Sequence, residues 1–414
     1  MKQLLLLAMT VATLVAVAAP KVQKSAVKVK DSGTTFAKDA LTPFVKSGQL
    51  PGAICIFYKD GIQETCAIGY SNIKTKRPIT LDDVYMQCSQ TKGFCGVTIA
   101  ILLEEGKIKL DDPVSKYLPE FKTLWIEKKT NDPNVRTLVK AKNTLTIRMV
   151  MNHTGGFPFE ISPKRPSIKG GGWSGGAPLR QTATIAATSP LLFEPGTKVT
   201  YSNTGIDIGA AIVEVVTGKH WEDFLQERVL TPLGMTSSTF WPTDKQLKTQ
   251  VEMYQLTNKG PEYRSFNGMQ QRPYNDRSRV FASAGAGLWT TAKDQLKFYK
   301  MLMNLGVGDN GVRILKEETV KKYLAVSSRP ANLGGYSLGL VAPIVDDGKG
   351  WFGHGGAWGT NCMVNYHRKE LRLWVVQLTG RNRPWDVKRN EAQTKFFQYV
   401  IDNKAADAYT GRMK

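Results

Sequence analysis

The amino-acid sequence predicts an α+β fold in which strands from both ends of the chain form one antiparallel sheet, flanked by helices, around a mostly helical insertion. Two strand-like runs flank a hairpin signal near the N-terminus, and three more strand-like runs lie near the C-terminus. Between them, residues from about 118 to 276 read mostly as helices joined by long loops. A strand is stable when it pairs with another strand and buries one face, and the N-terminal and C-terminal strands can do both in one sheet. We therefore predict a discontinuous α/β sheet domain, residues 35–118 and 277–414, and a mostly helical domain, residues 119–276.

The N-terminal strands are the most specific local prediction. A helix is expected over residues 36–46, and two apolar, β-branched runs follow at residues 53–58 and 65–70. Between these runs lies Asp60-Gly61, a dipeptide typical of two-residue hairpin loops because both positions accept a positive φ. The sequence therefore predicts a β-hairpin in this region.

The hairpin loop decides which residues face each other across the two strands. If Asp60 and Gly61 form the loop, Cys55 faces Cys66, whereas a register one residue away would separate them. A disulfide between them is an option in an oxidising compartment, and the sequence leaves it open. Since the number of cysteines is odd, at least one is unpaired unless a second chain supplies a partner; the five are Cys55, Cys66, Cys88, Cys95 and Cys362.

The remaining elements are predicted from apolar periodicity and from glycine and proline. A long apolar helix is expected from Ser89 to Glu105, ended by Gly106. The middle of the chain predicts a glycine-rich loop over residues 167–178 and helices over residues 145–151, 204–216 and 221–230. Near the C-terminus the pattern predicts a closing helix over residues 391–401 and strands over residues 337–342, 361–366 and 371–377.

Composition and charge exclude several classes of protein. Of the 414 residues, 42% are hydrophobic and 22% are charged, which excludes a disordered chain, a collagen and a disulfide-dense mini-protein. The 56 Lys and Arg residues against 35 Asp and Glu give a formal net charge of +21. The basic residues are spread along the whole chain and match no nucleic-acid-binding signature. We therefore expect no nucleic-acid partner, and a basic surface that favours anionic polymers or acidic substrates.

The first residues are typical of a secretory signal peptide. Lys2 precedes an apolar run over residues 4–17, and a small-x-small sequence, Ala-Val-Ala, stands at its end. We predict a signal peptide over residues 1–18 and a Lys-rich linker over residues 19–34. No later stretch reaches eighteen uncharged apolar residues, so no membrane span is expected in the mature chain. The predicted location is periplasmic or extracellular.

Two common kinds of hydrolytic site find no support in the sequence. The four histidines lack metal-binding spacing such as His-Glu-x-x-His, so neither a metal nor a cofactor is expected. A Gly-x-Ser-x-Gly motif is centred on Ser174, but a nucleophile elbow needs a strand before it and a helix after it. Residues 164–169 and the pair Ala177-Pro178 can form neither element. We interpret Ser174 as part of a loop.

A better candidate for a nucleophile is Ser89, in the sequence Ser89-Gln90-Thr91-Lys92 at the start of the long apolar helix. Residues three apart share a helix face, so the hydroxyl and the amine can form a hydrogen bond. The positive potential of a helix N-terminus disfavours an ammonium and lowers the pKa of Lys92 towards that of a useful base. Another Ser-x-x-Lys begins at Ser25, inside the linker, so only the position in the fold separates the two.

Two further motifs lie at predicted element boundaries downstream, Tyr201-Ser202-Asn203 at a helix start and His354-Gly355-Gly356 just before a strand. Two adjacent glycines let a backbone edge approach a bound substrate closely. Each motif alone also has a structural explanation, such as a helix cap, a buried tyrosine or a turn. The three motifs in this order, each at an element boundary, indicate a shared site.

In these motifs the sequence resembles the serine beta-lactamase and penicillin-binding-protein superfamily, in the class C branch that includes D-alanyl-D-alanine carboxypeptidases, D-aminopeptidases and esterases. The resemblance extends from about Phe36 to Val400 and also covers residues 103–113, 151–156, 194–196, 232–235 and 284–288. It implies a beta-lactamase/transpeptidase-like fold and an acyl-serine mechanism. The third motif departs from the beta-lactamase pattern, because Lys-Thr-Gly is usual where His354-Gly355-Gly356 stands here.

The resemblance implies a role for each catalytic residue. Ser89 would attack a carbonyl, while Lys92 and Tyr201 would share the general-base and general-acid work. Asn203 would orient the substrate or the lysine. Which of Lys92 and Tyr201 takes the first proton stays open.

The resemblance also implies the surroundings of the reacting carbonyl. The backbone amides of Ser89 and Ala357 would form the oxyanion hole, beside Gly355 and Gly356. His153 matches a structural motif of the family, and we expect it to be buried and fully hydrogen-bonded.

The leading hypothesis is an exported serine hydrolase that cleaves an ester or amide bond of a small-molecule or peptide substrate, for example one derived from the cell wall. It would be a carboxylesterase or a D-amino-acid peptidase. A class C beta-lactamase is the alternative, weakened because His354 lacks the fixed charge that binds a beta-lactam carboxylate, although a protonated His354 could still attract an anion. A non-catalytic substrate-binding or sensing domain is the second alternative, and the intact motifs speak against it.

Overall fold

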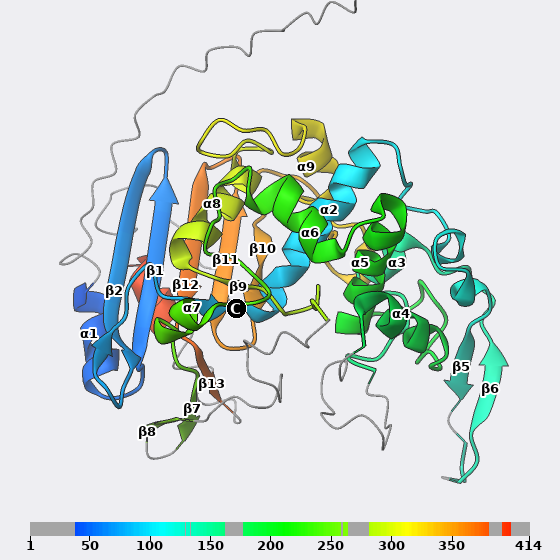
Figure 1. Cartoon of the computed structure of the whole chain (residues 1–414), viewed down its shortest axis with the longest axis horizontal. Helices are drawn as coiled ribbons and strands as arrows, with labels where there is room; N and C mark the ends of the chain where they lie inside the picture. The colour runs from blue at the N-terminus through cyan, green and yellow to red at the C-terminus, as the bar shows by residue number, and fades with distance from the viewer. Residues whose placement is uncertain are drawn as a thin grey trace, which may run out of the picture.

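The computed structural model describes residues 38–128, 130–132, 134–161, 177–257, 260–263, 281–380 and 391–398. Its main feature is a six-stranded antiparallel sheet in the order β10-β11-β12-β1-β2-β3 (Figure 1). The pairing of β12 with β1 joins strands from the two ends of the described chain, as predicted. The strands are β1 (Gly52–Lys59), β2 (Ile62–Asn72), β3 (Arg77–Pro78), β10 (Phe352–Gly356), β11 (Thr360–Asn365) and β12 (Glu370–Val375).

The hairpin of β1 and β2 has the predicted register. Cys55 pairs with Cys66, and the loop residues Asp60 and Gly61 have φ angles of +49° and +86°. Both cysteines are thiols in this structure and are not joined in a disulfide. Burial, with the neighbouring Cys66 adding to it, raises the pKa of Cys55 well above its ordinary value. The disulfide that the sequence left open is therefore not formed here.

Different helices cover the two faces of the sheet, because successive residues of a strand point to opposite faces. On one face, Cys55 and Phe57 pack in a cluster with α1 (Lys38–Lys46) and the helix over residues 391–398. On the other face, Ile54 and Ile56 join the main core, to which α2 (Thr91–Glu104) and α8 (Ala292–Met303) contribute. α8 packs directly on β11 and β12. The sheet is therefore a middle layer between two layers of helix.

The long helix α2 lies at the centre of the molecule. Every residue from Thr91 to Leu102 is buried, which is typical of a helix with protein on all sides. α2 contacts α5 (Asn203–Thr217) and α6 (Trp221–Leu225) as well as β10. Figure 1 shows α2 between the sheet and the group of α3 (Ile147–Met151), α4 (Leu179–Ala187) and α5. A site at the start of α2 therefore lies where the sheet meets the helices.

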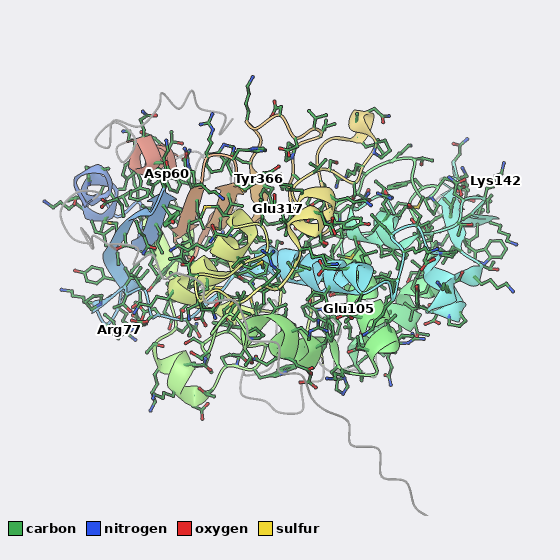
Figure 2. The ribbon with its side chains drawn as sticks, turned by 90° about the horizontal axis from the view of Figure 1, so that it is seen from above. Asp60, Arg77, Glu105, Lys142, Glu317 and Tyr366 are labelled. Carbon is green, nitrogen blue, oxygen red and sulfur yellow. The ribbon has the colours of Figure 1, made fainter. Side chains whose placement is uncertain are left out.

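The view from above shows the same division. Figure 2 labels Asp60, in the β1–β2 turn, and Lys142, just after β6, towards opposite ends of the molecule. The exact boundaries of the two predicted domains, near residues 118 and 276, stay a prediction.

The helical part matches the predicted helices and adds strands that the sequence analysis missed. α3, α5 and α6 fall on predicted helices, and α6 continues as a π-helical stretch over Gln226–Leu230. Four short strands were read as loop or helix: β5 (Trp125–Lys128), β6 (Thr137–Lys140), β7 (Tyr254–Thr257) and β8 (Gly260–Tyr263). β5 and β6 form a two-stranded sheet, whereas β7 and β8 belong to a three-stranded sheet with β13 (Leu378–Gly380). Each of the four missed strands has only four residues, which are too few for a clear periodicity.

The predicted strand over residues 337–342 is wrong. This segment is irregular apart from Val341, which forms an isolated antiparallel bridge with Gly353 of β10. The Ser337 amide donates to the Leu340 carbonyl at 2.8 Å. Gly339 has a φ of +72°, and a Cβ there would lie 2.1 Å from the carbonyl oxygen of Lys92. The glycine is therefore needed for a turn packed against α2, and that turn interrupts the strand that the apolar pattern suggested.

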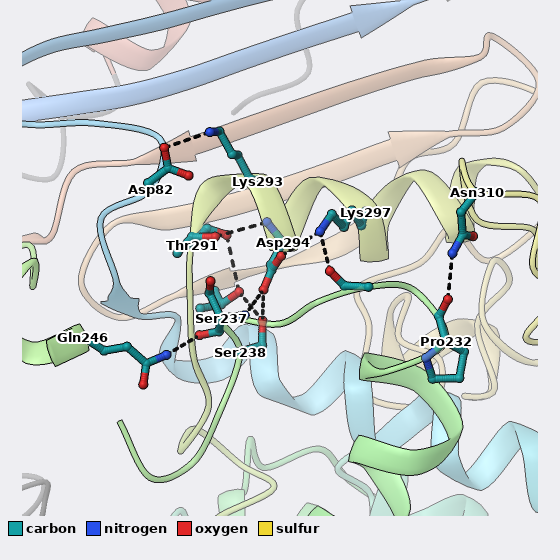
Figure 3. A network of polar contacts seen from close by, with 12 residues as sticks. Asp82, Pro232, Ser237, Ser238, Gln246, Thr291, Lys293, Asp294, Lys297 and Asn310 are labelled. Atoms are coloured by element: carbon teal, nitrogen blue, oxygen red, sulfur yellow. Dashed lines mark hydrogen bonds and ion pairs between the residues drawn. The ribbon is translucent and has the colours of Figure 1, made fainter. Parts of the chain in front are cut away.

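A polar network ties the helical part to the helix that packs on the sheet (Figure 3). The Thr291 side chain caps α8 by accepting from the Asp294 amide, and Asp294 lies in the first turn. Its carboxylate accepts from the Ser237 amide at 2.7 Å and from the Ser238 hydroxyl at 3.1 Å. A carboxylate near a helix N-terminus is also favoured by the helix dipole. The network holds the segment after α6 against the N-terminus of α8.

Several predictions fall on residues that the structure does not describe. The signal peptide over residues 1–18 and the linker over residues 19–34 lie outside the described residues, as does Ser174. Within the described part of the chain, no helix combines the length and the apolar composition needed to cross a membrane.

Candidate active site

Ser89 lies at the junction between the sheet and α2. It belongs to a 3-10 turn, Cys88–Gln90, that directly precedes α2, and not to the α-helix itself as the sequence predicted. Cys88 has a φ of +52°, a left-handed conformation that is uncommon for a residue with a side chain. Cys88 and Gln90 are buried whereas Ser89 is partly exposed. The sharp turn therefore leaves the Ser89 hydroxyl accessible at the start of a buried helix.

The Lys92 amine is fully buried and makes three hydrogen bonds. Its Nζ lies 3.2 Å from Ser89 Oγ, 2.6 Å from Asn203 Oδ1 and 2.6 Å from the Gly285 carbonyl oxygen. The two carbonyl oxygens can only accept, so they take two N–H donors. A neutral amine has two N–H groups and one lone pair, and this arrangement leaves the lone pair for the Ser89 hydroxyl. The geometry therefore suits an amine that accepts the serine proton.

The electrostatic surroundings favour the neutral form of this amine. Burial lowers the pKa of Lys92 from its ordinary value of 10.5 to about 7, against the opposing effect of the Asp207 charge. The sequence analysis attributed the lowered pKa to the helix N-terminus, whereas the main cause is removal from water. At neutral pH a substantial fraction of Lys92 is an uncharged base.

Tyr201 lies close to both the serine and the lysine. Its hydroxyl interacts with Ser89, and its ring centroid lies 4.6 Å from Lys92 Nζ. Burial raises the pKa of Tyr201 well above its ordinary value of 10, so the residue is a protonated phenol at neutral pH. The next residue, Ser202, caps α5 by accepting from the Gly205 amide at 3.0 Å. The helix cap thus determines the position of the tyrosine.

His153 is buried as expected, but it is not fully hydrogen-bonded. Its Nδ1 accepts from the Ser202 amide at 3.2 Å, and its carbonyl oxygen accepts from the Thr200 amide at 3.0 Å. Nε2 is buried and has no hydrogen-bond partner among the described residues, which corrects the prediction. The His153 ring lies between Tyr201 and Tyr336, with centroid distances of 4.4 and 4.5 Å. Both the backbone and the ring of His153 therefore contact the segment that carries Tyr201.

His354 lies within β10, the edge strand of the sheet, rather than just before a strand. Its Nδ1 is 2.5 Å from the Gly355 carbonyl oxygen, so Nδ1 carries the proton and donates. Its Nε2 then accepts from the Tyr336 hydroxyl at 2.9 Å, with the Tyr201 hydroxyl at 3.5 Å. Burial, followed by the Lys92 charge, lowers the pKa of His354 to about 3. The idea that a protonated His354 attracts an anion is therefore wrong, because the ring is neutral.

The residues after His354 differ in their need for glycine. A Cβ on Gly356 would lie 2.1 Å from Thr360 Oγ1 and 2.3 Å from the Gln87 carbonyl oxygen, so packing against the serine turn excludes a side chain. A Cβ on Gly355 would meet no described atom closer than 3.6 Å. Ala357 is exposed at the start of the β10–β11 turn, and its amide interacts with the thiol of Cys88. The motif thus borders the nucleophile turn.

Polar side chains hold β10 against the serine turn. Gln90 donates to the His354 carbonyl oxygen at 2.8 Å, and its own side-chain oxygen accepts from Gln295 of α8. Tyr85 donates in turn to the Gln295 side-chain oxygen. All three side chains are buried, so the position of the edge strand depends on this network.

The structure brings the predicted site residues together and adds three that sequence reasoning missed. Ser89, Lys92, Tyr201, Asn203 and His354 are linked by the contacts above. The additional groups are the Gly285 carbonyl, the Tyr336 hydroxyl and the Asp207 carboxylate. Gly285 lies in a segment already noted for its resemblance, residues 284–288, whereas nothing in the sequence singled out Tyr336 or Asp207. Among the described residues, no cluster of three histidine, cysteine or acidic side chains is placed to hold a metal ion.

Comparison with known proteins places this arrangement in a family. The family model described as Beta-lactamase matches residues 37–396. The chain belongs to the beta-lactamase family. It is a beta-lactamase-related serine hydrolase, and the resemblance stated from the motifs is confirmed.

The chain is also similar to individual proteins. Protein Rv1367c of Mycobacterium tuberculosis is 28% identical over 357 residues, which cover 80% of this chain and 86% of that protein. The LovD6 mutant of simvastatin synthase from Aspergillus terreus has a TM-score of 0.69 at 20% identity, over 88% of this chain and 96% of that one. D-amino acid amidase from Ochrobactrum anthropi, complexed with D-phenylalanine, has a TM-score of 0.65 at 18% identity, over 89% and 98% of the two chains. These structures confirm the predicted fold class.

Proposed function

We propose that the protein hydrolyses an ester or amide bond through an acyl-serine intermediate on Ser89. The observation that carries this proposal is the contact between an accessible serine hydroxyl and a buried amine, 3.2 Å apart, whose other two hydrogen bonds go to acceptors. A serine hydroxyl is a weak nucleophile unless a base takes its proton. Lys92 has the position and the protonation state for that role.

The remaining groups have complementary roles in this proposal. Lys92 takes the proton when Ser89 attacks the carbonyl, because its pKa of about 7 makes it a base at neutral pH and burial keeps Tyr201 protonated. Tyr201 donates its proton to the leaving group and regains one from the Lys92 ammonium, which restores both groups, and Asn203 holds the amine in place. The amides of Ser89 and Ala357 bind the developing oxyanion, where a single donor typically contributes about 3 kcal/mol.

The site favours esters and D-amino-acid amides or peptides over beta-lactams as substrates. A beta-lactam carboxylate is best bound by a fixed positive charge, and the neutral His354 supplies none. The structural similarity to a D-amino acid amidase supports the amide alternative. We propose export to the periplasm or the extracellular space on the basis of the N-terminal residues, which makes cell-wall-derived peptides accessible substrates. Both a beta-lactamase and a non-catalytic binding domain are alternatives that the following experiment tests.

Covalent labelling separates these alternatives. The protein is exposed to a fluorophosphonate and, separately, to a beta-lactam, and its mass and labelled peptide are determined by mass spectrometry. Hydrolysis of short-chain esters and D-amino-acid amides is measured in parallel. We expect labelling at Ser89 by the fluorophosphonate and turnover of an ester or amide. Labelling without any turnover would favour a binding domain, and faster turnover of the beta-lactam would favour a beta-lactamase.

The pH dependence of the reaction is a direct consequence of the base assignment. Lys92 is active only when neutral, so kcat/KM is expected to rise with pH through about 7 and then level off. The rise reflects loss of the ammonium proton, whose removal burial makes easier. The measurement is kcat/KM for one neutral substrate from pH 5 to pH 9. A rate that is flat across this range, or that falls with pH, would contradict the assignment.

Substitution of Gly355 tests whether the substrate lies along β10. Because its Cβ would meet no described atom closer than 3.6 Å, Gly355→Ala is expected to leave the thermal midpoint unchanged. If the substrate lies along β10 at Gly355, the added methyl group should displace its carbonyl and lower kcat/KM by about tenfold or more. Gly356→Ala is the matched control and should instead destabilise the fold, since its Cβ has contacts of 2.1 and 2.3 Å. Full activity in Gly355→Ala would place the substrate elsewhere.

A further inference from the structure

A buried carboxylate, Asp207, stands behind the proposed base and takes no direct part in the contacts of the serine. It lies on α5, one helical turn after Asn203, and only 7% of it is exposed. One of its oxygens, Oδ1, accepts from the Gly285 amide at 3.1 Å and from the Ser283 hydroxyl at 3.3 Å. The carbonyl of the same Gly285 accepts from Lys92 Nζ at 2.6 Å. Gly285 therefore links the two side chains: its amide donates to Asp207, and its carbonyl oxygen accepts from Lys92.

Packing makes this arrangement rigid. A Cβ on Gly285 would lie 2.7 Å from the Asn203 Cβ and 2.8 Å from Asn203 Oδ1, so the turn is pressed against α5 without room for a side chain. The Gly287 amide bonds the Ser283 carbonyl at 2.9 Å, which closes the turn. Residues four apart lie on one helix face, so Asn203 and Asp207 contact this turn together. One face of α5 therefore positions both oxygens that accept from Lys92, Asn203 Oδ1 and the Gly285 carbonyl oxygen.

A carboxylate at this place does more than an uncharged acceptor would. Buried carboxylates are rare unless they are paired, because burial penalises the charge. Burial raises the pKa of Asp207 to about 7 and lowers that of Lys92 to about 7, while each charge favours the other. The titratable groups that face Lys92 come from several elements: Asp207, Glu160, Cys88, Cys95, Tyr201, His153 and His354. Of the two carboxylates in this set, only Asp207 is buried.

We propose that Asp207 is a positioning residue for Lys92, because it fixes the Gly285 carbonyl as an acceptor and places a negative charge near the amine. This inference rests on the proposed function, in which Lys92 is the base. The hydrogen bonds of Asp207 go to the Gly285 amide and the Ser283 hydroxyl and not to Ser89. It acts through the turn at residues 283–287 and through the electrostatic field at the amine.

The charge is tested by Asp207→Asn, which retains an oxygen able to accept from the Gly285 amide and the Ser283 hydroxyl. Without the negative charge, the ammonium form of Lys92 is less favoured, so the rise of kcat/KM with pH should move to lower pH by about one unit. Glu214→Gln is the matched control, because Glu214 is another carboxylate of α5 and accepts from the Trp221 amide at 3.1 Å. The control should leave the pH profile where it is in the parent.

The positioning role is tested by Asp207→Ser, which removes the charge and is too short to hold the turn. It should show the same shift in pH and, in addition, a fall in kcat of about tenfold or more relative to Asp207→Asn, with KM little changed. Thermal midpoints of all variants are recorded, and Asp207→Ser repeats the test of charge if Asp207→Asn folds poorly. A pH profile of either variant that superimposes on that of the parent overturns the proposal.

The experiment distinguishes this inference from the proposed function. If the parent is not labelled at Ser89 by a fluorophosphonate, the proposed function fails and the inference fails with it. If the parent is labelled and active, but loss of the Asp207 charge leaves the pH profile unmoved, only the inference fails.

Discussion

Replacing Ser89 by alanine is expected to abolish hydrolysis and covalent labelling, with a fall in kcat of about four orders of magnitude or more. Without the hydroxyl there is no group to form the acyl intermediate, and the amine 3.2 Å away has no proton to accept from it. Ser89 is partly exposed, so the fold should survive the loss of one oxygen. The measurement is kcat for an ester or amide substrate, with the thermal midpoint recorded for each variant.

Two other serines are natural controls for this experiment. Ser174 stands in a Gly-x-Ser-x-Gly motif and Ser25 in a second Ser-x-x-Lys, so each is a nucleophile by motif alone. We expect Ser174→Ala and Ser25→Ala to keep full activity and full labelling. Activity of Ser89→Ala close to that of the parent would remove Ser89 from the mechanism. Loss of activity in Ser174→Ala alone would transfer the role to that residue.

Local spacing was sufficient to predict the parts of the site that lie close together in the sequence. Ser89 and Lys92 are three residues apart at a helix start, and their contact follows from helical geometry even though the serine itself lies in a 3-10 turn. Asn203 could be placed because it starts a helix with a clear apolar pattern. These predictions depend on backbone geometry that a few neighbouring residues determine.

The parts that sequence analysis missed depend on contacts between distant segments. Gly285 follows Lys92 by 193 residues and Tyr336 precedes His354 by 18, and no periodicity marks either as a partner. Asp207 is one residue within the predicted helix over residues 204–216, and its burial among the residues of that helix is seen only in the fold. The cause of the low pKa of Lys92 was missed for the same reason, because burial is a property of the assembled fold.

The same distinction applies to the strands. The β1–β2 register was predicted because a two-residue loop leaves one pairing, and the structure has Cys55 opposite Cys66. The run over residues 337–342 has the composition of a strand. Gly339, however, packs so closely on α2 that a Cβ there would lie 2.1 Å from the carbonyl oxygen of Lys92. A tertiary contact overrode a local preference. This contact lies at the backbone of Lys92, the proposed base.

Replacing Lys92 by methionine is expected to lower kcat and the rate of labelling by about a thousandfold, within the usual range for a general base. Methionine fills a similar volume without an amine, so the serine loses its proton acceptor while the core stays packed. The residual rate should also lose its dependence on pH near 7, since the group responsible is gone. A variant that keeps this pH dependence would show that another group, such as Asp207, is the base.

The stability of the same variant provides an independent check on the state of Lys92. In the folded protein its pKa is about 7, below the ordinary value of 10.5, so between these values the unfolded chain binds the proton more tightly. The free energy of unfolding of the parent should therefore gain a component that rises with pH from about 7 to 10.5, and Lys92→Met should lack it. Asp207 contributes with the opposite sign, between its ordinary 3.8 and about 7 in the parent, and loss of the Lys92 charge extends this range upward in the variant, so the two slopes differ further. Equal slopes for parent and variant, from denaturant titrations at several pH values, would mean that Lys92 is charged in the folded protein and cannot be the base.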